Sequence, residues 1–304
     1  MPTNRPIHFR PSRRAFVVTG VAAFARLRAM PATPSCTLTA EQEVGPYYIQ
    51  NQILRPNITE DRPGLPLKLR VALVDAKSCR PLPNAALDIW HCDALGVYSG
   101  FAAGADGPGG PGRRGPRGAD SFGFVPGMPP PPGPGMDGPG GPGGSPPPES
   151  RITDASRFLR GIQLTDHEGI AEFTTLYPGW YAGRAIHIHL KVHLGGHGEG
   201  GKYAGGHVSH TGQLFFPEDI TGEVARLEPY EKRLRVHRTL QSEDHVFNDE
   251  HGSTSMLSLS RLTKGTNADG FVGTVTLAVD PDATPATVGG PGGPGGRRGQ
   301  GHGR

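Results

Sequence analysis

The sequence predicts a mainly β protein, a single antiparallel β-sandwich domain with long loops, for three reasons. Several short stretches alternate apolar with polar residues, as half-buried strands do. Turns rich in glycine, proline and aspartate separate these stretches. The regular series of amphipathic helices that a doubly wound α/β fold requires is missing.

The first expected strand is residues 67–74, which read Leu-Lys-Leu-Arg-Val-Ala-Leu-Val and would bury one face. The same kind of alternation recurs at residues 171–175, 186–192, 255–259 and 271–279. Residues 218–236 mix charged and apolar side chains and are compatible with a helix, which Pro229 would break.

Three segments lack the composition of a folded core. Residues 1–35 have the features of a targeting segment, 102–150 form a Gly/Pro-rich insertion, and 282–304 form a Gly/Arg tail. We expect the insertion and the tail to be disordered, because such compositions bury too little apolar surface to fold. About 200 residues remain within 36–281, which is the size of a single domain.

The N-terminal segment carries an export pattern. Ser12-Arg13-Arg14 precedes a short apolar run at residues 17–25, as in twin-arginine signals that carry folded proteins across a membrane. The sequence therefore predicts a periplasmic or extracellular protein. Arg26 and Arg28 interrupt the run, so a basic leader on a cytoplasmic protein stays open. The run is too short for a stable membrane span.

Three cysteines are compatible with export to an oxidising compartment. We expect Cys36, just before the first strand, to pair with Cys79, which precedes a turn. Cys92 would then be left over. The chain has no C-x-x-C spacing, so the cysteines indicate neither a thioredoxin-like motif nor a structural zinc site.

The charge balance argues against a nucleic-acid partner. The net charge is only +3, and the arginines of the tail are not interleaved with aromatic residues that could stack on bases. Homo-oligomerisation stays open.

A candidate metal site lies around residues 181–189. If residues 186–192 form a strand, His187 and His189 point to the same side and can bind one metal ion. Tyr181, after the turn at Pro178-Gly179, would add the anionic oxygen that a ferric ion prefers. The same H-x-H pattern is also typical of a half-exposed polar strand, in a chain with 13 histidines.

Further segments follow one another in a characteristic order along the chain: Gly45-Pro46-Tyr47-Tyr48 and residues 90–101, 158–161, 177–189 and 211–216. Together they resemble the intradiol ring-cleavage dioxygenases, non-haem iron(III) enzymes that open catechols between the two hydroxyls. The likeness is strongest to the extracellular or protocatechuate 3,4-dioxygenase-like branch, and it spans roughly residues 36 to 280.

The resemblance implies roles for individual residues. Tyr98, Tyr181, His187 and His189 would be the ligands of Fe(III), with Tyr181 leaving the metal and acting as a base when substrate binds. Arg184 and Gln213 would be catalytic and line the substrate pocket. From the residues alone, a salt bridge or loop anchor is an equal interpretation of Arg184, and a strand-end aromatic is an alternative for Tyr98.

The substrate implied is a small aromatic diol, which O2 would convert to a cis,cis-muconate-type diacid. Tyr48 and Trp180, with Tyr47 and Trp90, are candidates for shaping the ring pocket, but no residue identifies the catechol. Two other classes stay open. One is a secreted, non-catalytic β-sandwich binding module. The other is a zinc or copper hydrolase or oxidase, for which phenolate ligands would be unusual.

Overall fold

The computed structural model describes residues 37–50, 53–101, 152–264 and 269–285. All of them belong to one compact unit that begins at residue 34. The predicted leader at 1–35, the insertion at 102–150 and Cys36 lie outside the described residues. The predicted tail lies outside them from residue 286 onward.

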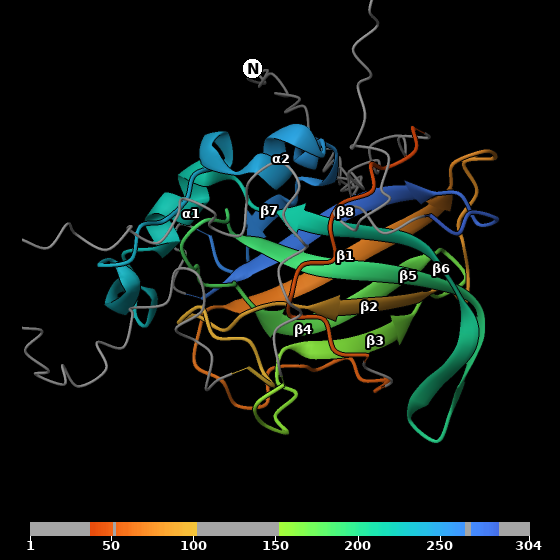
Figure 1. The fold of residues 1–304 in the computed structure, drawn as a ribbon, viewed down its shortest axis with the longest axis horizontal. Coiled ribbons are helices and arrows are strands. Elements are labelled where there is room, and N and C mark those ends of the chain that lie inside the picture. The colour runs from red at the N-terminus through yellow and green to blue at the C-terminus, as the bar shows by residue number, and fades with distance from the viewer. Residues whose placement is uncertain (1–36, 51–52, 102–151, 265–268, 286–304) are drawn as a thin grey trace, which may run out of the picture. The chain divides into compact units, whose positions relative to one another are not determined.

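The described residues form a β-sandwich of two four-stranded sheets (Figure 1). The first sheet has the strand order β4 (Ile170–Leu176), β1 (Pro66–Asp75), β8 (Phe271–Val279) and β7 (Ser258–Arg261). The second has the order β3 (Arg160–Leu164), β2 (Ala86–Trp90), β5 (His187–Glu199) and β6 (Lys202–Phe215). The mainly β sandwich predicted from the sequence is confirmed.

Alternation along the strands places the core between the sheets. In β1, the side chains of Leu67, Leu69 and Val71 are fully buried, whereas the residues between them are exposed or half-buried. In β5, Ile188 and Leu190 join the same core cluster from the other sheet. The histidines of β5 alternate with these core residues and therefore lie on the other face of the second sheet.

One strand pair departs from the predicted antiparallel arrangement. Strands β1 and β8 are parallel, with Leu67 opposite Phe271 and Asp75 opposite Val279, whereas the other named pairs are antiparallel. Parallel neighbours need a long crossover. Nearly the whole domain provides this crossover, because β1 is the first and β8 the last strand.

The predicted strands at 67–74, 171–175 and 271–279 are confirmed, and the strand expected at 186–192 continues to Glu199. The stretch 255–259 contains only the start of β7, because a 3-10 turn occupies Gly252–Ser255. Strands β2, β3 and β6 were not predicted. All five residues of β2 are buried, so it shows no alternation, and β6 contains several glycines.

Short helices connect β6 to β7 (Figure 1). Helix α1 spans Glu218–Val224, so the stretch 218–236 contains a helix as predicted, but this helix ends five residues before Pro229. A separate 3-10 turn at Tyr230–Arg233 begins directly after the proline. Helix α2 (His245–Asp249) follows a 3-10 turn at Gln241–Glu243. Within the described part of the chain, no helix is long and apolar enough to cross a membrane.

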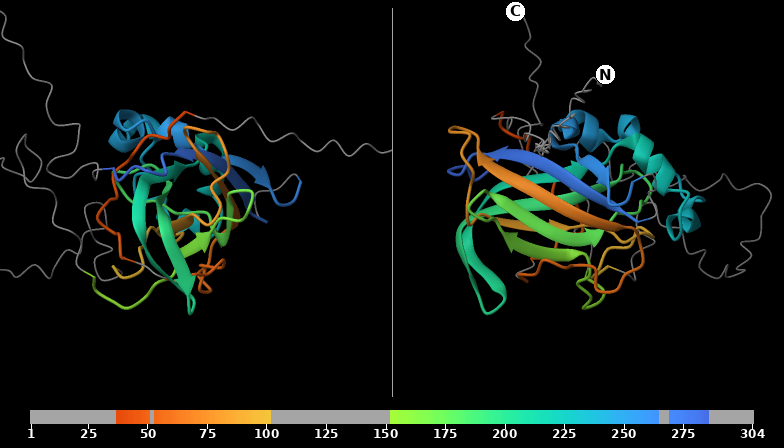
Figure 2. Two further views of the ribbon diagram at one scale, coloured as in Figure 1. Left: turned by 90° about the vertical axis from the view of Figure 1, so that its right-hand side faces the viewer. Right: turned by 180° about the vertical axis from the view of Figure 1, so that it is seen from behind.

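Two features of the chain path bear on the site. The C-terminal part of β5 and the N-terminal part of β6 extend as a hairpin beyond β2, because β2 pairs with β5 only as far as His193 (Figures 1 and 2). The chain on either side of residues 102–151 meets at a backbone hydrogen bond of 2.7 Å, which the Thr153 amide donates to Gly100. This junction lies two residues after Tyr98.

Candidate active site

Strand β5 aims two imidazoles at one place on the outer face of the second sheet. His187 and His189 are two residues apart, so their side chains leave the strand on the same side. His189 lies between Trp90 of β2 and Gln213 of β6 in the sheet register. Both histidines are almost fully buried.

Two phenols reach the same place from other parts of the chain. The hydroxyl oxygen of Tyr181 lies 3.3 Å from His187 Nε2, and that of Tyr98 lies 3.4 Å from the same atom. His189 Nε2 is 3.0 Å from His187 Nε2. The structure therefore brings all four predicted metal ligands together, although Tyr98 is 89 residues from His187 in the sequence.

These distances fit donor atoms that share one metal ion. Ligands bound about 2.0 Å from an ion are on the order of 3 Å from one another at the usual angles. His187 Nδ1 donates a hydrogen bond of 2.6 Å to the Ala185 carbonyl, which leaves the lone pair of Nε2 for a metal. Burial, followed by the Arg184 charge, lowers the pKa of His187, so the ring is neutral and can coordinate.

The two phenols lie in an environment where their ionised forms require a bound cation. Burial raises the pKa of Tyr98 well above its usual value, and Tyr181 raises it further. Burial also raises the pKa of Tyr181, against the opposing effect of Arg184. Both phenols are therefore protonated unless a bound metal ion replaces their protons. Among the described residues, no group of three or more His, Cys, Asp or Glu side chains converges, so this mixed set is the candidate metal centre there.

Aromatic rings enclose the four donors. The Trp90 indole lies parallel to the His189 ring, with 5.0 Å between centroids. Tyr47 stacks on Tyr98 with 4.4 Å between centroids and meets the edge of Tyr181. Gly45 approaches His189 so closely that a Cβ atom there would lie 2.9 Å from the imidazole Cε1. Gly45 and Tyr47 of the Gly-Pro-Tyr-Tyr segment thus pack directly against the donors.

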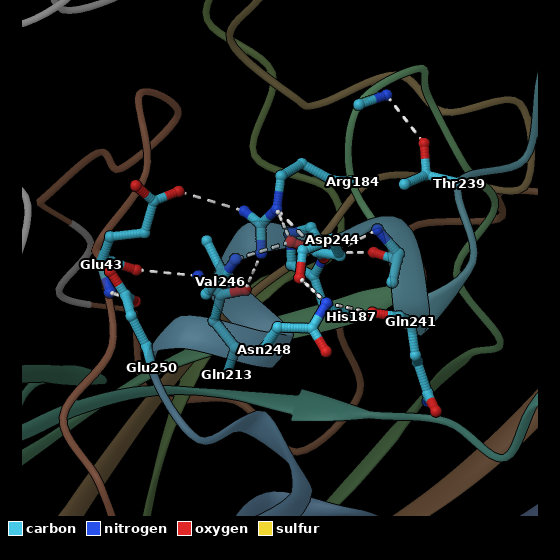
Figure 3. A network of polar contacts seen from close by, with 12 residues as sticks. Glu43, Arg184, His187, Gln213, Thr239, Gln241, Asp244, Val246, Asn248 and Glu250 are labelled. Carbon is cyan, nitrogen blue, oxygen red and sulfur yellow. Dashed lines mark hydrogen bonds and ion pairs between the residues drawn. The ribbon is translucent and has the colours of Figure 1, made fainter.

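A buried polar network adjoins the donors (Figure 3). Arg184 donates from Nε to both carboxylate oxygens of Asp244, at 3.1 and 3.2 Å. Its Nη1 donates to Glu43 Oε1 at 3.2 Å, and its Nη2 donates to Gln213 Oε1 at 2.6 Å. Burial opposes ionisation of Asp244, but Arg184 outweighs it and lowers the pKa of the carboxyl.

Comparison with solved structures identifies relatives of this fold. An intradiol ring-cleavage dioxygenase from Tetranychus urticae is 30% identical, with a TM-score of 0.61, and the match covers 83% of this chain and 98% of that chain. The chain belongs to the intradiol ring-cleavage dioxygenases. A second dioxygenase structure is also 30% identical, with a TM-score of 0.58, over 82% of this chain and 96% of that chain. No protein-family model and no curated protein matches the chain.

The family resemblance predicted from the sequence is therefore confirmed, and this chain is an intradiol ring-cleavage dioxygenase. The network around Arg184 includes two residues that the sequence did not single out, Glu43 and Asp244. Asp244 also accepts the amide of Val246 at 2.9 Å as the N-cap of α2. An aspartate at a possible helix N-cap was the one sequence feature that could have singled out Asp244, because no characteristic spacing links residues 43, 184 and 244.

For two residues predicted to line the ring pocket, the structure gives other partners than the four donors, and their role in the pocket stays a prediction. The Tyr48 hydroxyl donates to Asp88 Oδ2 at 3.3 Å. The Lys191 ammonium lies over the Tyr48 ring in a cation–π contact, 3.6 Å from the ring centroid. Trp180 is buried in the core between the sheets, and its Nε1 donates to the Val236 carbonyl at 3.0 Å. Tyr48 also packs against the cluster that contains Trp90 and Tyr98, with 4.8 Å between the ring centroids of Tyr48 and Trp90.

The cysteines divide into two kinds. Cys79 is disulfide-bonded, and Cys36, its predicted partner, lies outside the described residues. Cys92 is free and buried, in the same cluster as Trp90 and Tyr98. Burial raises its pKa, so it remains a thiol.

Proposed function

We propose that this dioxygenase is a non-haem Fe(III) enzyme that inserts both atoms of O2 into a catechol-type diol. The ring would open between its two hydroxyls and yield a cis,cis-muconate-type diacid. The observation that carries the proposal is that three donor atoms lie within 3.0 to 3.4 Å of His187 Nε2, namely His189 Nε2 and the hydroxyl oxygens of Tyr98 and Tyr181. Hard anionic oxygen and borderline nitrogen donors in this combination suit a trivalent ion.

Tyr98, Tyr181, His187 and His189 would hold the ion, and two phenolates would neutralise two of its three charges. An Fe(III) ion held there would supply Lewis-acid chemistry that draws electron density from the diol. Tyr98 is 3% exposed and packs under Tyr47, whereas Tyr181 is only partly buried. Tyr181 is therefore the phenol with more freedom to move when a substrate enters.

We assign Tyr181 the role of a base. Burial raises the pKa of its phenol, so its oxygen takes a proton readily once it carries a full negative charge. A diol must lose protons to bind through its oxygens, and Tyr181 Oη can accept one of them. Tyr98 and the two histidines would stay in place during this exchange.

Arg184 and Gln213 would orient and stabilise the reacting ring. Two contacts support this role: Arg184 Nη2 donates to Gln213 Oε1 at 2.6 Å, and Gln213 is paired with His189 in the register of β5 and β6. Although two carboxylates balance the charge of Arg184, a guanidinium and an amide in fixed positions would orient the ring and favour negative charge that develops close to their N–H groups. The salt bridge left open for Arg184 is present as well, and it holds the side chain in this position.

Export through the twin-arginine-type leader remains part of the proposal. The disulfide at Cys79 supports it, because stable disulfides belong mainly to oxidising compartments. Fusion of residues 1–35 to a reporter that folds before transport would test it. A reporter that stays in the cytoplasm would contradict export.

One experiment tests the enzymatic proposal. The full chain is expressed with iron, its metal content and visible spectrum are measured, and catechol is added without and then with O2. We expect about one iron per chain, a red tyrosinate-to-iron absorption that shifts with catechol, and a ring-opened diacid matched to O2 consumed. A colourless, inactive protein after iron loading would contradict the proposal and favour the non-catalytic binding module.

A further inference from the structure

The charge balance around Arg184 indicates which catechols the site accepts. Every nitrogen of its guanidinium has a partner, and the two ionic partners are the carboxylates of Asp244 and Glu43. One positive charge thus faces two negative charges, of which Asp244 is buried and Glu43 is half-buried. Arg184 differs from a free arginine, which would offer an unpaired cation to an anionic ligand.

The network leaves Arg184 little freedom to turn toward an anion. Gln213 accepts from Arg184 through Oε1 and donates from Nε2 to the Glu43 carbonyl at 2.9 Å, so its amide is held between the two residues. The Glu43 amide in turn donates to Glu250 Oε2 at 2.8 Å, which brings a third carboxyl group to this side (Figure 3).

Asp244 links the Arg184 network to the start of strand β5. It accepts the Ala185 amide at 2.8 Å, between Arg184 and β5, and it caps α2 through Val246. Release of Arg184 from Asp244 would leave a buried carboxylate without its counter-charge, which is costly. We therefore expect the ion pairs to persist when a ligand binds.

We infer that Glu43 and Asp244 make this site select catechols with uncharged ring substituents and discriminate against catechols that carry a carboxylate. This inference rests on the proposed function. Both are positioning residues, because they act through Arg184 and the local charge. A ring carboxylate on this side would meet two like charges and no unpaired cation, and like charges at close range reduce affinity.

The test compares two ligands of the same shape. The probes are 3,4-dihydroxybenzoate and its uncharged isostere 3,4-dihydroxybenzamide, and their Kd values are measured by calorimetry on the iron-loaded full chain without O2. We expect the wild type to bind the amide about tenfold more tightly. In Glu43→Gln, affinity for the benzoate should rise so that the Kd ratio falls several-fold, with the amide Kd within about twofold of its wild-type value.

A gain of affinity for one ligand is not what structural damage produces. Glu172→Gln serves as the control, because it removes the same charge from an exposed pair with Arg70 in the first sheet, and its Kd ratio should equal that of the wild type. A second measurement needs no variant. The Glu43 side chain is 26% exposed, so added salt should partly screen its repulsion of the benzoate and reduce the wild-type ratio.

Two results would overturn the inference. One is a wild type that binds the benzoate at least as tightly as the amide. The other is a folded Glu43→Gln protein with an unchanged Kd ratio. A protein that binds both ligands and then opens neither ring with O2 would contradict the proposed function instead, since the Kd ratio would still be measured.

Discussion

Trp90 and His189 lie with their rings parallel, tilted by only 1° and with 5.0 Å between centroids. The two residues are neighbours on β2 and β5, so the sheet register itself sets the stack. Trp90 is almost fully buried, and its indole therefore limits how the His189 ring can rotate. A ligand to a metal must be held in a narrow range of orientations, which gives this contact a function beyond packing.

Replacement of Trp90 should therefore loosen the metal centre. We expect Trp90→Leu to lower the free energy of unfolding by about 3 kcal/mol, through lost burial, and to reduce iron affinity. Trp90→Phe is the matched control, because it retains an aromatic face against His189. Urea unfolding and iron titration measure the two effects, and equal iron affinity in both variants would exclude a role in orienting His189.

The two tyrosines should differ when each loses its hydroxyl. We expect Tyr98→Phe to lose most of its iron, because Tyr98 is buried and fixed under Tyr47. Tyr181→Phe should retain more iron, with an altered visible band and slower catechol binding, because the proposed base is missing. Metal analysis and stopped-flow absorbance distinguish the variants, and full iron and activity in Tyr98→Phe would rule out its role as a ligand.

Gly45 should tolerate no side chain. It has φ of 68°, and a Cβ atom there would lie 2.9 Å from His189 Cε1. Gly45→Ala is expected to destabilise the protein by about 1 to 2 kcal/mol and to displace His189. Gly200→Ala is the control, because Gly200 also has positive φ, 57°, but nothing lies within 4 Å of its Cβ position.

Loss of iron affinity in Gly45→Ala alone would assign the effect to the contact with His189. Similar iron affinity in the two alanine variants would instead assign the effect to backbone strain.

His91 should contribute a pH dependence to stability. It is fully buried, its Nδ1 donates to the Cys92 carbonyl, and its Nε2 accepts from the Thr175 hydroxyl. Burial lowers its pKa to about 4. The unfolded chain binds a proton at His91 near pH 6.5, whereas the folded chain does not, so its contribution to stability falls as the pH drops from about 6.5 to about 4.

The slope of that contribution is about 1.4 kcal/mol per pH unit. We expect His91→Gln to be less stable than the wild type at pH 7 and to lose less stability on acidification. Urea unfolding at several pH values measures the difference. Parallel curves for the two proteins would show that His91 titrates equally in the folded and unfolded states.

Local patterns in the sequence were sufficient to predict several features. The period of two in a β-strand placed His187 and His189 on one face, and Tyr181 is close enough in sequence to join them. The ordered motifs predicted the family, and alternation predicted β1, β4 and β8. Each of these depends on residues within one element, or on a fixed order of segments, which the chain carries without folding.

Only the tertiary structure decided how distant segments meet. Strands β2 and β3, and the parallel pairing of β1 with β8, depend on contacts between strands far apart in the chain. Tertiary contacts also set the partners of Tyr48 at Asp88 and of Trp180 in the core, which no local pattern predicts. The partners of Arg184 are 141 and 60 residues away, at Glu43 and Asp244. Ion pairs between distant segments have no characteristic separation in the sequence, because the packing of whole elements sets their geometry.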